Sequence, residues 1–272
     1  MFDKKNNNIT AVVIGFFLIV IIAVITFYHP RSNKPAQDDA PSTISESDSS
    51  QKPSNKLRSD ELMDKIKSKQ AIIIIDTRAS EAFQQEHILD SKNIPFANIE
   101  KSLPDLEKNK TYVIMDDGSA IGSSLANGIF PGNGIGDVFY LDGGFPAWKN
   151  NNEPTISSGD PSSFADQSKV NYIKSDQLKD LLNTESNLAI IDLRSSSHYK
   201  ESHLPGAINI FIDDLESKRG KIPVGKKIIL YDKDGLWAFQ GAVRLFDMGF
   251  FNVFCLSDGL DSWQQKKYPL TK

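Results

Sequence analysis

The sequence contains few residues that could form a disulfide or bind a metal. It has one cysteine, Cys255, in 272 residues, which excludes an intrachain disulfide and a multi-cysteine metal site. The four histidines show no zinc-ligand spacing. Basic residues do not outnumber acidic ones, and the formal net charge of −4 argues against nucleic acid as a partner. Packing alone has to hold the fold, and we expect no metal and no cofactor.

One segment lacks charge altogether. Residues 9–28 are twenty uncharged, mostly apolar residues, and a helix of that length at ~1.5 Å per residue spans about 30 Å, the hydrocarbon thickness of a bilayer. We therefore expect a transmembrane helix after a short tail, residues 1–8. A cleaved signal peptide is the competing interpretation. Its apolar region is usually ~7 to 15 residues long and is followed by small residues, whereas this run ends in Tyr28, His29 and Pro30.

The flanking charges leave the membrane orientation open. Lys4 and Lys5 precede the apolar run, and Arg31 and Lys34 follow it, an even count under the positive-inside rule. The short amino-terminal tail with its free amine favours an amino terminus inside the cell. This orientation would make the globular part extracytoplasmic.

Two stretches have the composition of linkers. Residues 29–56 are rich in Ser, Pro, Asp, Asn and Lys, with almost no large apolar side chain. Such a stretch buries too little surface to offset the entropy of ordering, so we expect a disordered linker. A second break, residues 154–169, is rich in Ser, Gly, Asp and Pro. It predicts a boundary between two domains.

The remaining sequence repeats itself at a domain-sized interval. Asp76, for example, matches Asp192 across an offset of 116 residues. Solenoid repeats recur every ~20 to 50 residues, whereas a compact domain has ~100 to 150, so this offset predicts two domains of one fold, residues 57–153 and 170–272. The matched residues are Asp76, Arg78, Phe83, His87 and Ile94 in the first domain and Asp192, Arg194, Tyr199, His203 and Ile210 in the second.

Both domains have the pattern of α/β units with parallel strands. Acidic residues follow Ser59 and Ser175, so we expect these serines to cap helices. Apolar runs at 71–75 and 188–191 are each followed by an aspartate, the pattern of a strand buried on both faces of a parallel sheet. Further apolar runs lie at 112–115, 138–141, 228–231 and 253–256. The predicted fold is two tandem α/β domains, each a parallel sheet flanked by helices.

In an open α/β sheet, ligands bind outside the carboxyl ends of the strands. The segments to inspect are therefore the two loops that leave a predicted strand and enter a helix. Such a loop points several backbone N–H groups inward and forms a natural anion site. The loops consist of Asp116, Asp117, Gly118, Ser119, Ala120 and Ile121, and of Asp232, Lys233, Asp234, Gly235, Leu236 and Trp237.

An ordered series of motifs surrounds these loops. The second domain contains Asp192-Leu193-Arg194, His203-Leu204-Pro205-Gly206-Ala207, Leu256-Ser257-Asp258-Gly259 and Trp263. The first contains the looser series Asp76-Thr77-Arg78, Glu86-His87, Leu141-Asp142-Gly143-Gly144 and Trp148. Both series resemble the signature of the rhodanese family of sulfurtransferase domains, and the resemblance covers both predicted domains.

The resemblance implies a cysteine as the first loop residue. Its thiolate would carry sulfur as a persulfide, and an arginine late in the loop would hold the anionic donor. Here the first loop residues are Asp116 and Asp232, and the late positions hold Ile121 and Trp237. A carboxylate cannot form a persulfide. The sequence therefore predicts a membrane-anchored tandem protein that is catalytically inactive and acts as a binding or scaffolding module for an unknown protein partner or small ligand.

An alternative stays open: a thiosulfate sulfurtransferase, or another sulfur-handling enzyme, that uses Cys255 or a partner's cysteine. Cys255 lies in an apolar run, however, which favours a buried, inert side chain. Four charged residues of the family motif, Asp76, Arg78, Asp192 and Arg194, are best explained as structural ion pairs. His87 and His203 are best explained as structural histidines. The abundance of Lys, Asn and Ile suggests an AT-rich bacterial source.

Acidic residues remain as the one further functional signal. Three carboxylates of each domain follow predicted strands: Asp116, Asp117 and Asp142, and Asp232, Asp234 and Asp258. If they gather at one sheet edge, each former anion pocket becomes negative and suits a cation or an amine. The competing interpretation is ordinary solvated turn residues, because aspartate is common in turns.

Overall fold

The structure, a computed structural model, describes residues 55–272. The predicted tail 1–8, the predicted transmembrane helix 9–28 and nearly all of the predicted linker 29–56 lie outside the described residues. Within residues 55–272, no helix combines the length and apolar character that crossing a bilayer requires. Lys56, predicted to belong to the linker, lies in the first strand.

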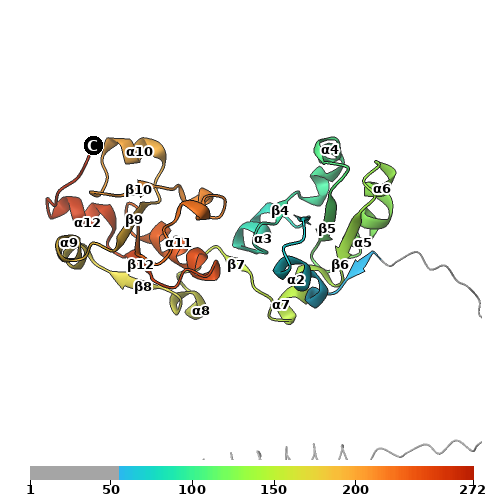
Figure 1. Cartoon of the computed structure of the whole chain (residues 1–272), viewed down its shortest axis with the longest axis horizontal. Coiled ribbons are helices and arrows are strands. Elements are labelled where there is room, and N and C mark those ends of the chain that lie inside the picture. The colour runs from blue at the N-terminus through green and yellow to red at the C-terminus, as the bar shows by residue number, and fades with distance from the viewer. Residues whose placement is uncertain (1–54) are drawn as a thin grey trace, which may run out of the picture. The chain divides into compact units, whose positions relative to one another are not determined.

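The first domain is built on a five-stranded, all-parallel sheet. Its strand order is β1-β6-β5-β2-β4, and its elements can be followed from blue to green in Figure 1. The strands are β1 (Lys56–Leu57), β2 (Ile72–Asp76), β4 (Lys92–Asn93), β5 (Thr111–Met115) and β6 (Val138–Leu141). The α-helices are α2 (Ser59–Lys67), α3 (Ser80–Gln85), α4 (Ile99–Ser102), α5 (Ile121–Ser124), α6 (Phe130–Gly132) and α7 (Gly144–Asn150). Short 3₁₀ turns η1 (Phe96–Asn98) and η2 (Leu103–Asp105) and a π-helical turn η3 (Leu125–Ile129) complete it.

The second domain repeats this topology. Its five parallel strands have the corresponding order β8-β12-β11-β9-β10, in yellow to red in Figure 1. They are β8 (Asn171–Ile173), β9 (Leu188–Asp192), β10 (Ile208–Asn209), β11 (Lys227–Tyr231) and β12 (Val253–Leu256). The helices are α9 (Ser175–Thr184), α10 (Ser196–Glu201), α11 (Leu236–Asp247) and α12 (Gly259–Gln265), with 3₁₀ turns η4 (Ile212–Asp214) and η5 (Arg219–Lys221). The predicted fold of two tandem α/β domains is confirmed.

Apolar side chains pack in two clusters in each domain, as expected for a sheet covered on both faces. In the first domain one cluster includes Leu62 of α2 and Trp148 of α7, and the other includes Phe130. In the second domain Trp263 of α12 belongs to one cluster and Val243 of α11 to the other. Burial on both faces explains why the strands read as continuous apolar runs rather than alternating ones.

The connector between the domains is more ordered than its composition suggested. Within the predicted linker 154–169, the structure has strand β7 (Ile156–Ser157) and helix α8 (Phe164–Gln167). Strand β7 pairs antiparallel with β3 (Glu86–His87) of the first domain. The Ser157 N–H also donates to the Asp247 carboxylate of α11 in the second domain at 3.0 Å. The connector is thus bonded to both domains, which residue composition alone does not reveal.

The predicted serine caps are wrong by one residue. Ser59 and Ser175 are the first residues of α2 and α9, not the residues before them. In α2 the carboxylate of Glu61 instead accepts the N–H of the preceding residue, Arg58, at 2.8 Å. Ser175 donates its hydroxyl to Asp258 at 2.9 Å, whereas the buried Ser59 hydroxyl has no hydrogen-bond partner. The first domain has Gly143 at the position that corresponds to Asp258.

These two serines provide a matched pair for a stability test. We expect Ser175→Ala to lower the free energy of unfolding of the second domain by about 1 kcal/mol, because a buried hydrogen bond to a carboxylate is lost. Ser59→Ala should leave the stability of the first domain unchanged or raise it by up to about 1 kcal/mol, since that buried hydroxyl has no hydrogen bond to lose and an unpaired buried polar group costs free energy. Urea unfolding with amide hydrogen exchange reports each domain separately. Equal losses in the two variants would contradict this explanation.

Candidate functional site

Both predicted loops lie where a parallel sheet presents its ligand-binding edge. Loop 116–121 follows β5 and loop 232–237 follows β11, each in the middle of its sheet. The register aligns Asp76 with Met115 and Asp192 with Tyr231, so the neighbouring strands end level with the start of each loop. The loops and the Asp–Arg motifs therefore occupy one edge of each sheet.

In the first domain, the loop folds around the side chain of its own first residue. Asp116 is 3% exposed. Its Oδ1 accepts the N–H of Gly118 at 2.9 Å, and its Oδ2 accepts the N–H of Gly122 at 2.8 Å. The Ser119 hydroxyl donates to Oδ2 at 3.2 Å. The inward-pointing donors of the loop thus already have an anionic partner.

Asp232 has the same role in the second domain. Its Oδ1 accepts N–H groups from Gly235 at 2.9 Å and Ala238 at 3.2 Å, and its Oδ2 accepts the N–H of Trp237 at 3.2 Å. Burial raises the pKa of this carboxyl; these N–H bonds lower it in part, and the charge of Asp234 raises it further. Between the ordinary and the raised pKa the folded state binds more protons, so the stability contributed by Asp232 falls as the pH rises through that window.

Two glycines let the next helix approach each loop closely. Gly144 and Gly259 begin α7 and α12 with positive φ angles of 57° and 58°. A Cβ atom on Gly144 would lie 2.4 Å from Oδ1 of Asp116, and one on Gly259 would lie 2.2 Å from the carbonyl oxygen of Lys233. Any larger residue would push the helix away from the loop. Close packing of each helix against its loop thus explains the glycines at these two motif positions.

This arrangement determines what the loops can bind. An external anion would find the loop N–H groups occupied and a negative charge in their midst. At contact distance, repulsion between two unit charges is about 1 to 4 kcal/mol for effective dielectric constants between those of water and a protein surface. The loops have the geometry of an anion site in which a side chain of the protein has replaced the anion.

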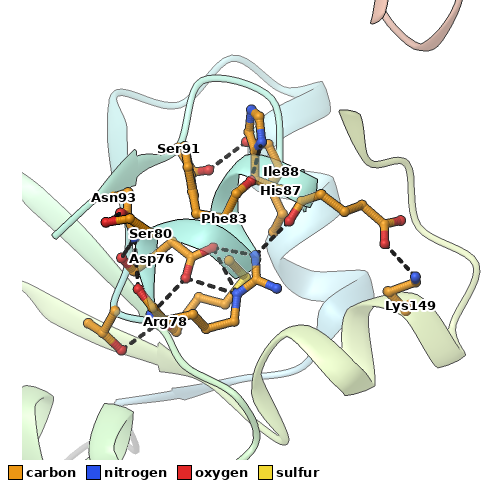
Figure 2. A network of polar contacts seen from close by, with 12 residues as sticks. Asp76, Arg78, Ser80, Phe83, His87, Ile88, Ser91, Asn93 and Lys149 are labelled. Carbon is orange, nitrogen blue, oxygen red and sulfur yellow. Dashed lines mark hydrogen bonds and ion pairs between the residues drawn. The ribbon is translucent and has the colours of Figure 1, made fainter. Parts of the chain in front are cut away.

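The Asp–Arg motif of the first domain lies at the end of the strand beside the loop. Arg78 donates to both carboxylate oxygens of Asp76, at 2.7 to 3.1 Å, and to the carbonyl of Glu86 at 2.7 Å. Its guanidinium also lies 3.6 Å from the ring centroid of Phe145. Figure 2 shows this network, with Asn93 on one side of it and His87 beside Phe83 on the other. The predicted structural ion pair is present.

The second domain has the same pair with one addition. Arg194 donates to Asp192 at 2.7 Å and to the Ser202 carbonyl at 2.6 Å. Burial alone would lower the pKa of Arg194, but its bonds with Asp192 raise it overall. The buried Tyr231 hydroxyl also donates to Asp192, at 2.6 Å, and burial raises its pKa strongly. Arg194 is therefore committed to the fold and is a poor candidate for holding a ligand anion.

Comparison with known proteins agrees with this geometry. The family model described as "Rhodanese-like domain" matches residues 59–151 and again residues 174–266. The chain belongs to the rhodanese-like domain family. The two matches fall on the two sheets described above, so each domain has a rhodanese-like fold.

The two sequence relatives below each match a stretch about as long as one domain, whereas the solved structure aligns over more of the chain. The uncharacterized protein YibN of Escherichia coli K12 is 28% identical over 108 residues, covering 39% of this chain and 75% of that protein. A sulfurtransferase of Allochromatium vinosum is 22% identical over 101 residues, covering 37% of this chain and 94% of that one. A solved thiosulfate sulfurtransferase from Pseudomonas aeruginosa aligns over 79% of this chain and 43% of its own length, with 19% identity and a TM-score of 0.42.

The thiol of this rhodanese-like chain lies near one loop but is closed off. Cys255 is 1% exposed in β12 and donates its S–H to the Gly235 carbonyl at 3.5 Å. Burial, together with the charges of Asp232 and Asp258, raises the pKa of this thiol to about 12. A reactive cysteine needs a lowered pKa and access to its substrate. The predicted burial of Cys255 is confirmed.

A pocket of about 480 Å³ opens above the second loop. Its lining includes Trp237 and Leu236 from the late loop, Asp234, and His198 from α10. The first domain has a smaller pocket of about 280 Å³ beside its late loop, with an apolar lining that includes Ile121. The two loops thus present different surfaces despite their common frame.

The predicted acidic pocket is present only in part. Asp232 and Asp234 line the same pocket, but the other carboxylates have partners of their own. Asp142 pairs with Lys56 at 3.0 Å, and Asp258 accepts hydrogen bonds from Ser175 and Ser262. Within residues 55–272, no group of His, Cys, Asp and Glu side chains has a geometry that could hold a metal ion. The six aspartates therefore do not form two equivalent negative clusters.

The sequence repeat did not reveal every residue around the site. His198 lines the second pocket, and Asp261 lines it from α12, yet their counterparts in the first domain are Ala82 and Pro146. A repeat identifies the residues that two domains share, but it does not identify functional residues that only one of them has. His87 also has a partner outside its own domain, the Glu216 carboxylate, at 2.9 Å.

Proposed function

We propose that this chain is a membrane-anchored tandem rhodanese-like protein without sulfurtransferase activity, which acts as a binding or scaffolding module. The observation that carries the proposal is the pair of buried aspartates at the first loop position. Asp116 and Asp232 have no sulfur to transfer, and their oxygens take the backbone donors that a persulfide or a thiosulfate would need.

The competing enzyme function finds little support. Cys255 is buried, its pKa is raised, and its S–H is bonded to a backbone carbonyl. The late loop positions hold Ile121 and Trp237 where the family resemblance implies an arginine. A partner's cysteine would also have to bring its own anion site, because both loops are filled.

The binding role is supported by the second domain's pocket. The exposed Trp237 and Leu236 form an apolar wall beside Asp232 and Asp234. Aromatic and aliphatic side chains next to a few polar groups are typical of ligand and partner sites. The pocket would therefore bind a ligand or partner at the place of the family's active-site loop, although the loop has no nucleophile.

The first test is a sulfur-transfer assay with the full chain in detergent, measuring thiocyanate formed from thiosulfate and cyanide. We expect the wild type and Cys255→Ala to match the rate without protein, because neither loop has a thiolate. Asp232→Cys with Trp237→Arg places a thiol among the same N–H donors and adds a cation. Its new cysteine should react with iodoacetamide at least tenfold faster than Cys255, with a pKa below the ~8.5 of a free thiol.

Two outcomes of this assay would contradict the proposal. Wild-type turnover that disappears in Cys255→Ala would show that the buried thiol is catalytic. An introduced cysteine that proves unreactive, in a variant with an unchanged circular dichroism spectrum, would show that the loop does not offer its donors to a side chain at this position. The corresponding double variant of the first domain, Asp116→Cys with Ile121→Arg, serves as the matched control. It places a thiol and a cation at the same two loop positions of the other domain.

The second test addresses anchoring and binding together, in membranes of cells that produce the chain. The full chain should remain in the membrane fraction after a carbonate wash, whereas a chain lacking residues 1–30 should be released, because the apolar run 9–28 is its anchor.

Binding is tested in the same membranes by photo-crosslinking. A benzophenone side chain at position 237 should give one discrete photo-adduct. The same group at Val224, which is 87% exposed and precedes strand β11 whereas the loop follows it, should give none. Equal adducts at both positions, or release of the full chain, would contradict the proposal.

A further inference from the structure

The pocket above the second loop has an aromatic wall that is held in place. Trp237 meets Phe211 in a T-shaped contact, with ring centroids 5.8 Å apart and an interplanar angle of 81°. An aromatic ring has two faces, and a neighbour in such a contact covers at most one of them. The Trp237 side chain lines the pocket of about 480 Å³ and remains 38% exposed. The pocket therefore offers a fixed indole surface to a ligand.

Carboxylates outnumber cations around this pocket. The charged residues of its lining are Arg194, Asp232, Lys233, Asp234 and Asp261. Arg194 is already paired with Asp192 at 2.7 Å, which leaves Lys233 against three carboxylates. Because unlike charges attract and like charges repel, the pocket favours a cationic ligand over an anionic one.

Two of the carboxylates have oxygens that are open to a ligand. Within residues 55–272, the side chain of Asp261 makes no hydrogen bond and no ion pair. Asp234 accepts the N–H of Leu236 through Oδ1 at 3.2 Å, and in the same part of the chain its Oδ2 has no bond. One carboxylate lies in the loop and the other on α12. A cation in the pocket could therefore accept contacts from two elements.

The chemistry of the lining favours a guanidinium over other cations. Among the described residues, no group of His, Cys, Asp and Glu could hold a metal ion, which argues against a bare divalent cation. A guanidinium is planar, so it can stack on an indole face while its N–H groups donate to carboxylates. The ammonium of lysine is a compact point charge without such a plane. Trp237 beside Asp234 and Asp261 thus suits arginine best.

A second hollow adjoins the pocket and points to a peptide ligand. It has a volume of about 240 Å³, and Leu236 lines both spaces. Its lining is mostly apolar and includes Phe239 and Tyr172, which is 51% exposed. Two adjoining hollows of different character suit two neighbouring side chains of one chain segment. Free arginine would also bring its own carboxylate towards an acidic pocket, whereas an arginine within a peptide would not.

We propose, on the basis of the binding role inferred above, that the second domain recognises an arginine side chain of a protein partner. The guanidinium stacks on Trp237 and donates to Asp234 and Asp261. An apolar side chain next to the arginine occupies the hollow on the other side of Leu236.

The first domain lacks the groups that this recognition needs. The residues that correspond to Asp234, Trp237 and Asp261 are Gly118, Ile121 and Pro146. The smaller pocket beside the first loop has no charged residue in its lining. The first loop therefore serves as an internal control for any test of the second.

The test titrates the ¹⁵N-labelled full chain in detergent with a capped pentapeptide, glycine-leucine-arginine-leucine-glycine. We expect a saturable shift of the Trp237 indole N–H signal at millimolar peptide. Citrulline has the shape of arginine without its charge, and its substitution for arginine should weaken binding about tenfold. Serine in place of both leucines should weaken binding about threefold, because apolar burial is lost. The amides of Gly118 and Gly122 should not shift.

Three variants with the same change of charge test the residues. Asp234→Asn and Asp261→Asn should each weaken peptide binding about fivefold. Both should fold normally, because Asp261 has no side-chain bond to lose and the oxygen of an asparagine can still accept the Leu236 N–H. Asp180→Asn is the matched control. Asp180 is exposed on α9 and does not line the pocket, so this variant should keep the wild-type affinity.

Three outcomes would overturn the proposal: a shift that does not saturate, equal affinity for the arginine and citrulline peptides, or equal losses in Asp180→Asn and Asp261→Asn. These outcomes are separable from the proposed function. A discrete photo-adduct at position 237 without a preference for arginine would keep the binding role and reject arginine as the ligand. Sulfur transfer by the wild type would instead contradict the absence of enzyme activity.

Discussion

The fold of both loops depends on one interaction: a buried carboxylate that accepts the backbone N–H groups around it. Asp116 and Asp232 each take three donors from the turn that follows their strand. Leaving those donors unpaired inside the protein would cost roughly 1 to 3 kcal/mol each. The same carboxylates therefore hold the loop in the shape of the site. Under the proposed function, the missing nucleophile and the retained loop geometry have a common physical cause.

Around this shared centre the two domains have diverged. The second loop leads into the continuous helix α11, whereas the first leads into a helix broken by the π-helical turn η3. Glycine and proline residues in that stretch of the first domain, including Gly128 and Pro131, explain the difference through their poor helix propensity. The second domain also has the larger of the two loop pockets and the exposed Trp237. A tandem of one fold thus offers two different surfaces.

The fold could be predicted from the sequence because its strands are buried on both faces. Val138–Leu141 and Val253–Leu256 match the predicted strands residue for residue. Contacts between the two domains could not be predicted in this way. Arg219, which bonds Asp90, corresponds to Leu103 in the first domain, so the repeat gives it no weight. Glu216 corresponds to Glu100, but this match does not reveal its partner His87. The position of each loop aspartate was predictable, but its bonds were not, because backbone N–H directions follow from the turn geometry and not from residue identity. The predicted caps at Ser59 and Ser175 are wrong for the same reason, because the cap position also depends on the local backbone geometry.

The most direct test of this account is a titration of the ¹⁵N-labelled full chain with thiosulfate, followed through the loop amide signals. If the carboxylates fill both anion sites, the amides of Gly118, Gly122, Gly235 and Ala238 should not shift at millimolar thiosulfate. Exposed amides elsewhere should move only slightly and without saturation. A saturable shift of the loop amides would show that an external anion displaces Asp116 or Asp232, and would contradict the account.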